Sequence, residues 1–366
     1  MATAYCGRLF GMVGADVVKV EPPGGDPMRA EHPRVTTTGG EERSARFEYL
    51  NCFKRGVVLD GDGDGALWDL LAGADVVIDH VDGDVDRAVT DAARVHAANP
   101  ASVYVAVSGF GLTGPYARYR SNAFLDFASG GHTYINGAPG REPLAAGGPW
   151  AGYLHGTTAA VGAVAALRGA RETGAGQLVD VGAMEALAST HQWSIVLFTH
   201  AGVVKRRAGN RHAESYHPMG LLEAKDGWVG FAIASTQQWE GLCLALDVPE
   251  LLADERFETG GDRFDNADAL DAHLRPALMA MTADEVVRRA QEFRAPAGPL
   301  LKLGDVLEVR QLLARGFWQA MPDFGPAAVL PERPFRLPHA DAPFRAAPAL
   351  GADTGAVLAG LAAEAA

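Results

Sequence analysis

Short apolar runs alternate with amphipathic segments through the first half of the chain. β-branched, mostly apolar runs predict a buried strand at 17–23 and further strands at 55–60, 75–81 and 102–111. Helical periodicity predicts helices between and before them, at 5–14, 64–74 and 84–100. Strands that alternate with helices predict a parallel α/β sheet, and ligands of such sheets bind at the carboxyl ends of the strands. In this sequence those ends are rich in glycine and proline, as in "EPPGGDPMR" and "SGFGLTGP".

The pattern changes in the second half. An alanine-rich helix at 157–171 is followed by a strand and a helix over 178–190, and then by a hairpin in "GLLEAKDGWVGFAIAS". Short acidic helices follow over 236–315, and the Pro- and Ala-rich tail ends in a helix. These changes predict a large domain at 1–200, completed by 316–366, and a smaller domain at 213–315.

Composition and charge narrow the class of protein. Hydrophobic residues make up 48% and charged residues 21%, as in ordinary soluble enzymes. The net charge of −13 argues against nucleic acid or an anionic membrane as a partner. Cys6, Cys52 and Cys243 are too far apart for a zinc motif and favour a reducing compartment. The most apolar stretch, 157–167, is too short to span a bilayer. We therefore expect a cytoplasmic protein without a metal.

Several longer motifs carry a family resemblance. "LFGMVGADVVKVEPPGGDPMR", "NPASVYVAVSGFGLTGPY", "RETGAGQLVDV" and "NRHAESYHPMGLLEAKDGWV" resemble the family III CoA-transferases, which include α-methylacyl-CoA racemase. The resemblance implies a Rossmann-like large domain built from both chain ends, a smaller α+β domain and an interlocked dimer. It also implies that coenzyme A lies across the carboxyl edge of the sheet. The family pattern includes one more strand and part of a CoA loop ahead of the helix at 5–14.

The resemblance also implies a set of CoA-binding residues. Arg29 and Arg87 match basic family positions, and guanidinium groups suit phosphate through paired hydrogen bonds. The alternative is that both arginines cap helices or pair with the abundant carboxylates. Asp62 and Asp82 replace basic family residues and would repel phosphate, which Arg118 and Arg120 could offset. The implied CoA-binding set is Arg29, Leu59, Asp60, His80, Val81, Arg87 and Arg120.

The family's catalytic groups are the largest departure. In the transferases an aspartate attacks the thioester and is acylated. Counting back from "TTAAVG" places Gly152 at that position, and the sequence has no aspartate between Asp126 and Asp180. The His–Asp pair of the racemase falls at Ser121 and Asn122. The sequence therefore lacks both known catalytic sets.

Two ionisable residues are candidates for a relocated catalytic group. His155, three residues after Gly152, is expected near a helix N-terminus, which favours the neutral imidazole that a general base needs. The alternative is a structural histidine bonded to the backbone. Asp126 would supply a carboxylate if its side chain points inward.

Three functions remain open at this point. The first is an enzyme on acyl-CoA thioesters, a CoA-transferase by resemblance but with relocated catalytic groups. Its alternative reaction is that of a lyase, dehydratase or isomerase, with backbone N–H groups of "GGPWAG" as oxyanion stabilisers. The second is a non-catalytic subunit of a heterodimer with an Asp-containing homologue, whereas the expected partner of a catalytic chain is a second copy in a homodimer. The third is a binding protein for an acyl group not carried on CoA, which Asp62 and Asp82 suggest. We favour the first.

Overall fold

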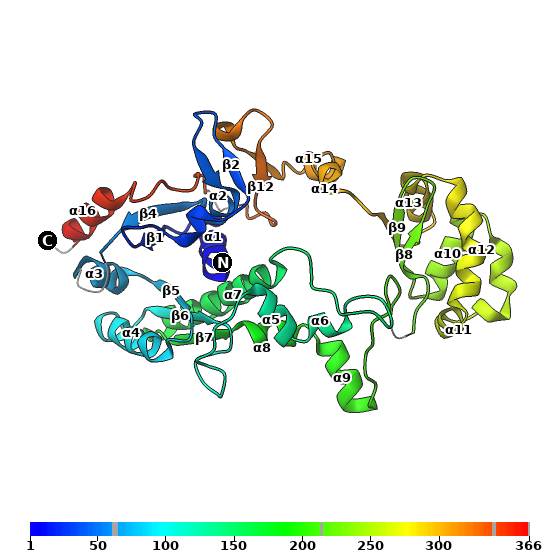
Figure 1. Ribbon diagram of the computed structural model, residues 1–366, viewed down its shortest axis with the longest axis horizontal. Helices are drawn as coiled ribbons and strands as arrows, with labels where there is room; N and C mark the ends of the chain where they lie inside the picture. Colours follow the sequence, from blue (N-terminus) through cyan, green and yellow to red (C-terminus); the bar gives the residue numbers. More distant parts are fainter. Residues whose placement is uncertain (61–64, 213–214, 339–341, 365–366) are drawn as a thin grey trace. The chain divides into compact units, whose positions relative to one another are not determined.

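The computed structural model describes residues 1–60, 65–212, 215–338 and 342–364 (Figure 1). The chain folds into two compact units. Unit 1 consists of Met1–His132, Ala145–Gln192 and Gln311–Ala366, and unit 2 consists of Thr133–Leu144 and Trp193–Arg310. The large domain expected at 1–200 differs from unit 1 in including residues 133–144 and 193–200.

Unit 1 contains the parallel strands that the sequence predicts. β1 (Val17–Glu21) pairs with β4 (Lys54–Val58), and β6 (Val103–Ser108) lies between β5 (Val76–Val81) and β7 (Leu178–Gly182). All of these pairings are parallel, which confirms the α/β fold class.

Helices cover both faces of β6. Val103, Val105 and Val107 pack towards α1 (Ala2–Met12) and α7 (Trp150–Thr173). The alternate residues Tyr104 and Ala106 pack with α4 (Val85–Ala98) and with Trp68 of α3 (Gly65–Gly73). Side chains of a strand alternate between faces, so a strand covered on both sides is apolar throughout. Near the other strand pair, α16 (Thr354–Glu364) packs against β4.

The contact between α1 and α7 depends on small residues. A Cβ atom at Gly156 would lie 2.6 Å from the carbonyl oxygen of Ala2, so only glycine allows this approach. On the sheet side, α7 is buried through alanines at 159, 163, 166 and 170.

The start of α7 corrects the sequence prediction. The helix begins at Trp150 rather than at residue 157, so most of the 147–156 stretch is helix and not a glycine loop. Its glycines lower helix propensity, but the close packing against α1 outweighs that cost.

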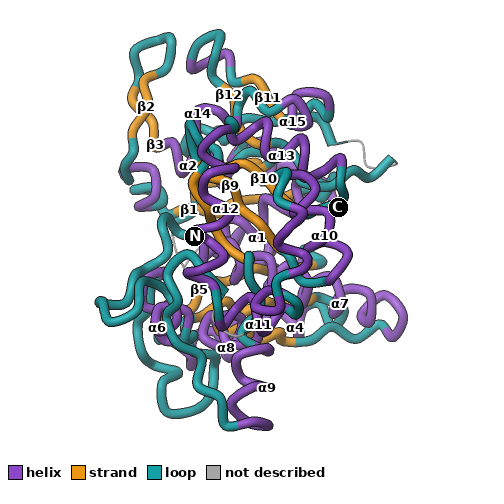
Figure 2. Tube along the Cα trace, turned by 90° about the vertical axis from the view of Figure 1, so that its right-hand side faces the viewer, coloured by secondary structure: helices purple, strands orange, loops and turns teal. Residues whose placement is uncertain are grey.

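The remaining elements of unit 1 connect and cover these layers. Figure 2 shows β2 (Arg34–Thr36) and β3 (Glu42–Ser44) side by side in a hairpin. That hairpin and the one formed by β11 and β12 have no counterpart in the sequence prediction. The others are α2 (Ala45–Asn51), α5 (Ala123–Ser129), α8 (Ala183–Ser189), β11 (Trp318–Ala320) and β12 (Val329–Pro331), with α6 (His132–Ile135) and α15 (Arg310–Ala314) at the unit boundaries.

Unit 2 is a smaller α+β unit. Its antiparallel sheet has β9 (Trp228–Ala232) between β10 (Ala297–Pro299) and β8 (Met219–Glu223), and β8 and β9 form the predicted hairpin. Val229, Phe231 and Ile233 form its core with helix residues such as Trp239 and Leu242. Its elements are α9 (Gln192–Ala201), β8 (Met219–Glu223), β9 (Trp228–Ala232), α10 (Thr236–Ala245), α11 (Gly260–Asp265), α12 (Ala267–Ala280), α13 (Ala283–Glu292), β10 (Ala297–Pro299) and α14 (Leu303–Val306). Across the described residues, no helix has the length and hydropathy of a membrane span.

Candidate active site

The candidate site lies at the carboxyl ends of β5, β6 and β7. Val81, Ser108 and Gly182 stand in register there. α7 precedes β7 and packs on the same sheet, so its first turn lies at this edge. This is the edge at which parallel α/β sheets bind ligands.

Gly152, which the family resemblance predicts at the position of the nucleophile, is buried in the first turn of α7. A Cβ atom built there has the Met1 side chain as its three nearest neighbours, with Sδ at 2.9 Å. No carboxylate of the described residues comes closer to that point. The amide of Gly152 donates to the Pro149 carbonyl oxygen at 3.0 Å, so it is not the oxyanion donor that the sequence suggested.

His155 lies deeper in the helix than expected. It is the sixth residue of α7 and is buried, and its Nε2 lies 3.0 Å from the carbonyl oxygen of Val181. A carbonyl only accepts, so Nε2 carries the proton and the neutral ring keeps its lone pair on Nδ1. Burial is the main cause that lowers the pKa of His155, and the helix N-terminus expected from the sequence is not needed.

Asp126 supplies a buried carboxyl at the same edge. Asp126 is only 7% exposed, and its Oδ1 accepts a hydrogen bond from the Ser121 hydroxyl. A Cβ atom built at Gly109, directly after β6, would lie 3.7 Å from the same oxygen. Asn122 caps α5 and thereby fixes the turn that carries the carboxyl. Burial raises the pKa of Asp126, and the Ser121 bond opposes that shift only in part.

Arg29 has an extensive set of contacts within unit 1. Its guanidinium donates to both carboxylate oxygens of Glu21 at 2.7 Å, and to the Pro348 carbonyl oxygen at 3.0 Å. It also lies 3.9 Å above the centre of the Phe47 ring. These contacts match the structural alternative for Arg29, since they use much of its hydrogen-bonding capacity.

Arg87 is held in a similar way. It donates to Asp79 of β5 at 2.9 Å and to Asp91 of α4 at 2.8 Å. Tyr104 donates to the same Asp79 oxygen at 2.9 Å. The two carboxylates raise the pKa of Arg87 despite its partial burial, so the side chain stays charged. A CoA phosphate would have to compete with the carboxylates of Asp79 and Asp91 for the Arg87 guanidinium.

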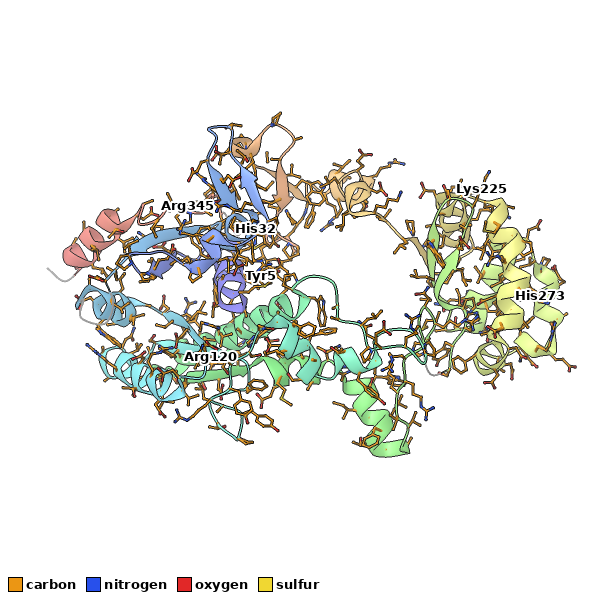
Figure 3. All side chains as sticks on the ribbon, viewed as in Figure 1. Tyr5, His32, Arg120, Lys225, His273 and Arg345 are labelled. Atoms are coloured by element: carbon orange, nitrogen blue, oxygen red, sulfur yellow. The ribbon has the colours of Figure 1, made fainter. Side chains whose placement is uncertain are left out.

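The other predicted CoA-binding residues lie directly after β4, at the end of β5 and on the loop after β6. Arg120 lies on the loop after β6 (Figure 3), with a side chain 85% exposed and 3.7 Å from Asp82. Arg118 pairs with Asp86 in the first turn of α4 at 2.7 Å. Arg120 thus faces Asp82, the acidic change it was expected to offset. Asp60 and His80 are exposed, Leu59 and Val81 are buried, and Asp62 lies outside the described residues.

The structure also reveals a histidine pair that the sequence did not connect. The rings of His132 and His191 lie 3.8 Å apart between centroids, and His132 is 5.4 Å from Trp150, the first residue of α7. His132 Nε2 lies 3.1 Å from the Leu187 carbonyl oxygen. The two histidines are 59 positions apart in sequence, and no spacing motif joins them.

Comparison with known proteins places the chain in a family. The model of CoA-transferase family III matches residues 1–354, and the chain belongs to this family. It is 31% identical to the succinyl-CoA–L-malate CoA-transferase alpha subunit of Chloroflexus aurantiacus, over 86% of this chain and 74% of that protein. It is 28% identical to the beta subunit, over 98% of this chain and 90% of that one. A solved CAIB/BAIF family protein from Brucella suis superposes with a TM-score of 0.85 and 30% identity, covering 99% of this chain and 96% of that one.

Two glycines of α7 give a matched stability test. Gly152→Ala meets only the flexible Met1 side chain, so we expect its free energy of unfolding to change by less than about 1 kcal/mol. Gly156→Ala meets the Ala2 backbone and should destabilise by about 2 kcal/mol. Urea unfolding of both variants checks this, and equal effects would contradict the packing of α1 on α7.

His155 predicts a pH dependence of stability. Its folded pKa is lowered below the unfolded value of about 6.5, so folding favours the neutral ring. Its contribution is therefore complete above that value and is lost as the pH falls towards the folded pKa. We expect His155→Gln to lose less stability than the wild type between pH 8 and pH 5, as measured by urea unfolding. His32→Gln, at an exposed position, is the control, and identical pH profiles for wild type and His155→Gln would refute the assignment.

Proposed function

We propose that the protein binds acyl-CoA thioesters at the carboxyl ends of β5, β6 and β7 and moves a proton on the acyl group through Asp126. The reaction class is isomerase or lyase, because its first step is removal of the proton next to the thioester carbonyl. The relatives' names support a CoA thioester as substrate, since they act on succinyl-CoA. The exposed Arg120 is the best placed predicted residue for the CoA phosphates.

Acyl transfer through position 152 is not supported. Glycine has no side chain to acylate, and the Met1 side chain lies where a carboxylate would begin. His155 is a weaker candidate than Asp126, because one ring nitrogen is bonded to Val181 and the ring is buried in the helix packing.

The buried carboxyl of Asp126 carries the proposal. Burial raises its pKa towards neutral pH, which suits a group that must both accept and return a proton. The Asp126 carboxylate removes the α-proton, and the C–H electron pair moves onto the thioester oxygen as an enolate. The α7 N-terminus, with its partial positive charge, favours that oxyanion. The proton then returns to the acyl group.

Substitution of Asp126 tests the proposal. In D2O, the wild type should exchange the α-protons of propionyl-CoA for deuterium, read by mass spectrometry. Asp126→Asn should slow this exchange by about a hundredfold or more, and Asp126→Glu should retain part of it. Asp284→Asn, at an exposed aspartate of α13 in unit 2, is the control with the same charge change. Exchange at the wild-type rate in Asp126→Asn would contradict the role of Asp126.

A second candidate function is that of a subunit without its own nucleophile. The finding that favours it is that both an alpha and a beta subunit of one transferase are similar to this chain. A homologue that carries the aspartate would then complete the active site. Co-expression with such a homologue should yield a 1:1 complex with CoA-transferase activity that neither chain has alone. A homodimer of this chain that exchanges α-protons would contradict it.

A further inference from the structure

A cavity of about 450 Å³ opens in unit 1, between the end of α15 and the segment after β12 (orange in Figure 1). Its lining includes Arg315, Arg333 and Arg336 together with Phe317 and Phe335. This volume lies within the range that small-molecule sites occupy.

The lining of the cavity is positively charged, whereas the chain as a whole is negatively charged. The protein carries a net charge of −13, yet the cavity gathers three arginines and one acid, Glu332. Glu332 lies 3.4 Å from Arg333, and within the described residues no carboxylate pairs with Arg315 or Arg336. Two guanidinium groups therefore bring positive charge to the cavity without a carboxylate partner, which favours an anionic ligand.

The backbone around the cavity holds the arginines in place. Arg333 donates to the carbonyl oxygen of Met12, the last residue of α1, at 3.3 Å. Arg336 donates to the carbonyl oxygen of Arg315, which joins the two segments of the lining. The side chains of Arg333 and Arg336 thus link the lining to α1 and connect its two segments.

The cavity is separate from the candidate active site. Met1 and Ala2, at the start of α1, lie against Gly152 and Gly156 of α7, whereas Met12, the last residue of α1, contacts Arg333. An eleven-residue helix spans about 16 Å. Moreover, α1 leads into the start of β1, so the cavity lies near the amino ends of the strands and the candidate active site near the carboxyl ends.

We propose that this cavity binds a nucleoside di- or triphosphate. The guanidinium groups of Arg315 and Arg336 would bind the phosphates through paired N–H···O bonds. The rings of Phe317 and Phe335 offer apolar faces on which a planar base stacks. Neither feature belongs to the acyl-CoA reaction proposed above, so the two assignments stand independently.

Calorimetric titration with ADP, ATP and pyrophosphate tests the proposal on the full chain. ADP and ATP should bind the wild type, and Arg315→Gln/Arg336→Gln should weaken binding by about tenfold or more, because it removes two charge-assisted contacts. Arg168→Gln, an exposed arginine of α7, is the matched control and should bind as the wild type does. Phe335→Leu should weaken ADP but leave pyrophosphate unchanged. Unchanged thermal unfolding confirms that each variant is folded.

CoA itself contains an adenosine diphosphate moiety, so a competition experiment separates the two sites. ADP binding should persist in the presence of saturating CoA. Loss of ADP binding under saturating CoA, an unaffected double variant, or no binding of ADP or ATP at millimolar concentration would each overturn the proposal. Binding of pyrophosphate as tightly as ADP would overturn the role of the aromatic rings. None of these outcomes depends on whether Asp126 is catalytic.

Discussion

The close approach of α1 to α7 is the constraint on which the candidate site depends. Gly156 admits the Ala2 carbonyl oxygen into contact with the α7 backbone, and no residue with a Cβ atom fits there without a shift. The alanines of α7 pack against Val103, Val105 and Val107 of β6. This packing positions the first turn of α7, which contains residue 152, at the carboxyl edge of the sheet.

The electrostatics of that edge follow from the same packing. A closed layer of small and apolar side chains excludes water, so the ionisable groups left inside it shift towards their neutral forms. His155 and Asp126 shift in opposite directions for this one reason, because burial penalises the charged state of each. A carboxylate with the ordinary pKa of an aspartate is a weak base at neutral pH. Desolvation raises the pKa of Asp126 and makes it a stronger base. In the proposed function this shift makes Asp126 the acid–base group, and that function does not require a nucleophile at position 152.

The sequence predicted the layers better than the contacts. The apolar run at 102–111 predicts a strand, and the structure has β6 there with every residue buried. The start of α7 was predicted too late, because its glycines weaken the local helix signal while tertiary packing restores the helix. For Arg29 the sequence left phosphate binding and ion pairing open. Its bonds to Glu21 join residues from one βα connection, and no pattern in the sequence determines which acid an arginine will choose. The hydrogen bond from Ser121 to Asp126 could not be predicted from the sequence either, because it depends on how the chain turns between β6 and α5.

The central claim is that Asp126, and no group at position 152, faces the reacting carbon of a CoA thioester. A crystal structure with a non-hydrolysable thioether analogue of an acyl-CoA tests this most directly. The account predicts the carboxyl of Asp126 within about 3.5 Å of the carbon next to the acyl carbonyl. A bound analogue whose acyl group contacts a different carboxylate, or lies away from the carboxyl ends of β5, β6 and β7, would contradict it.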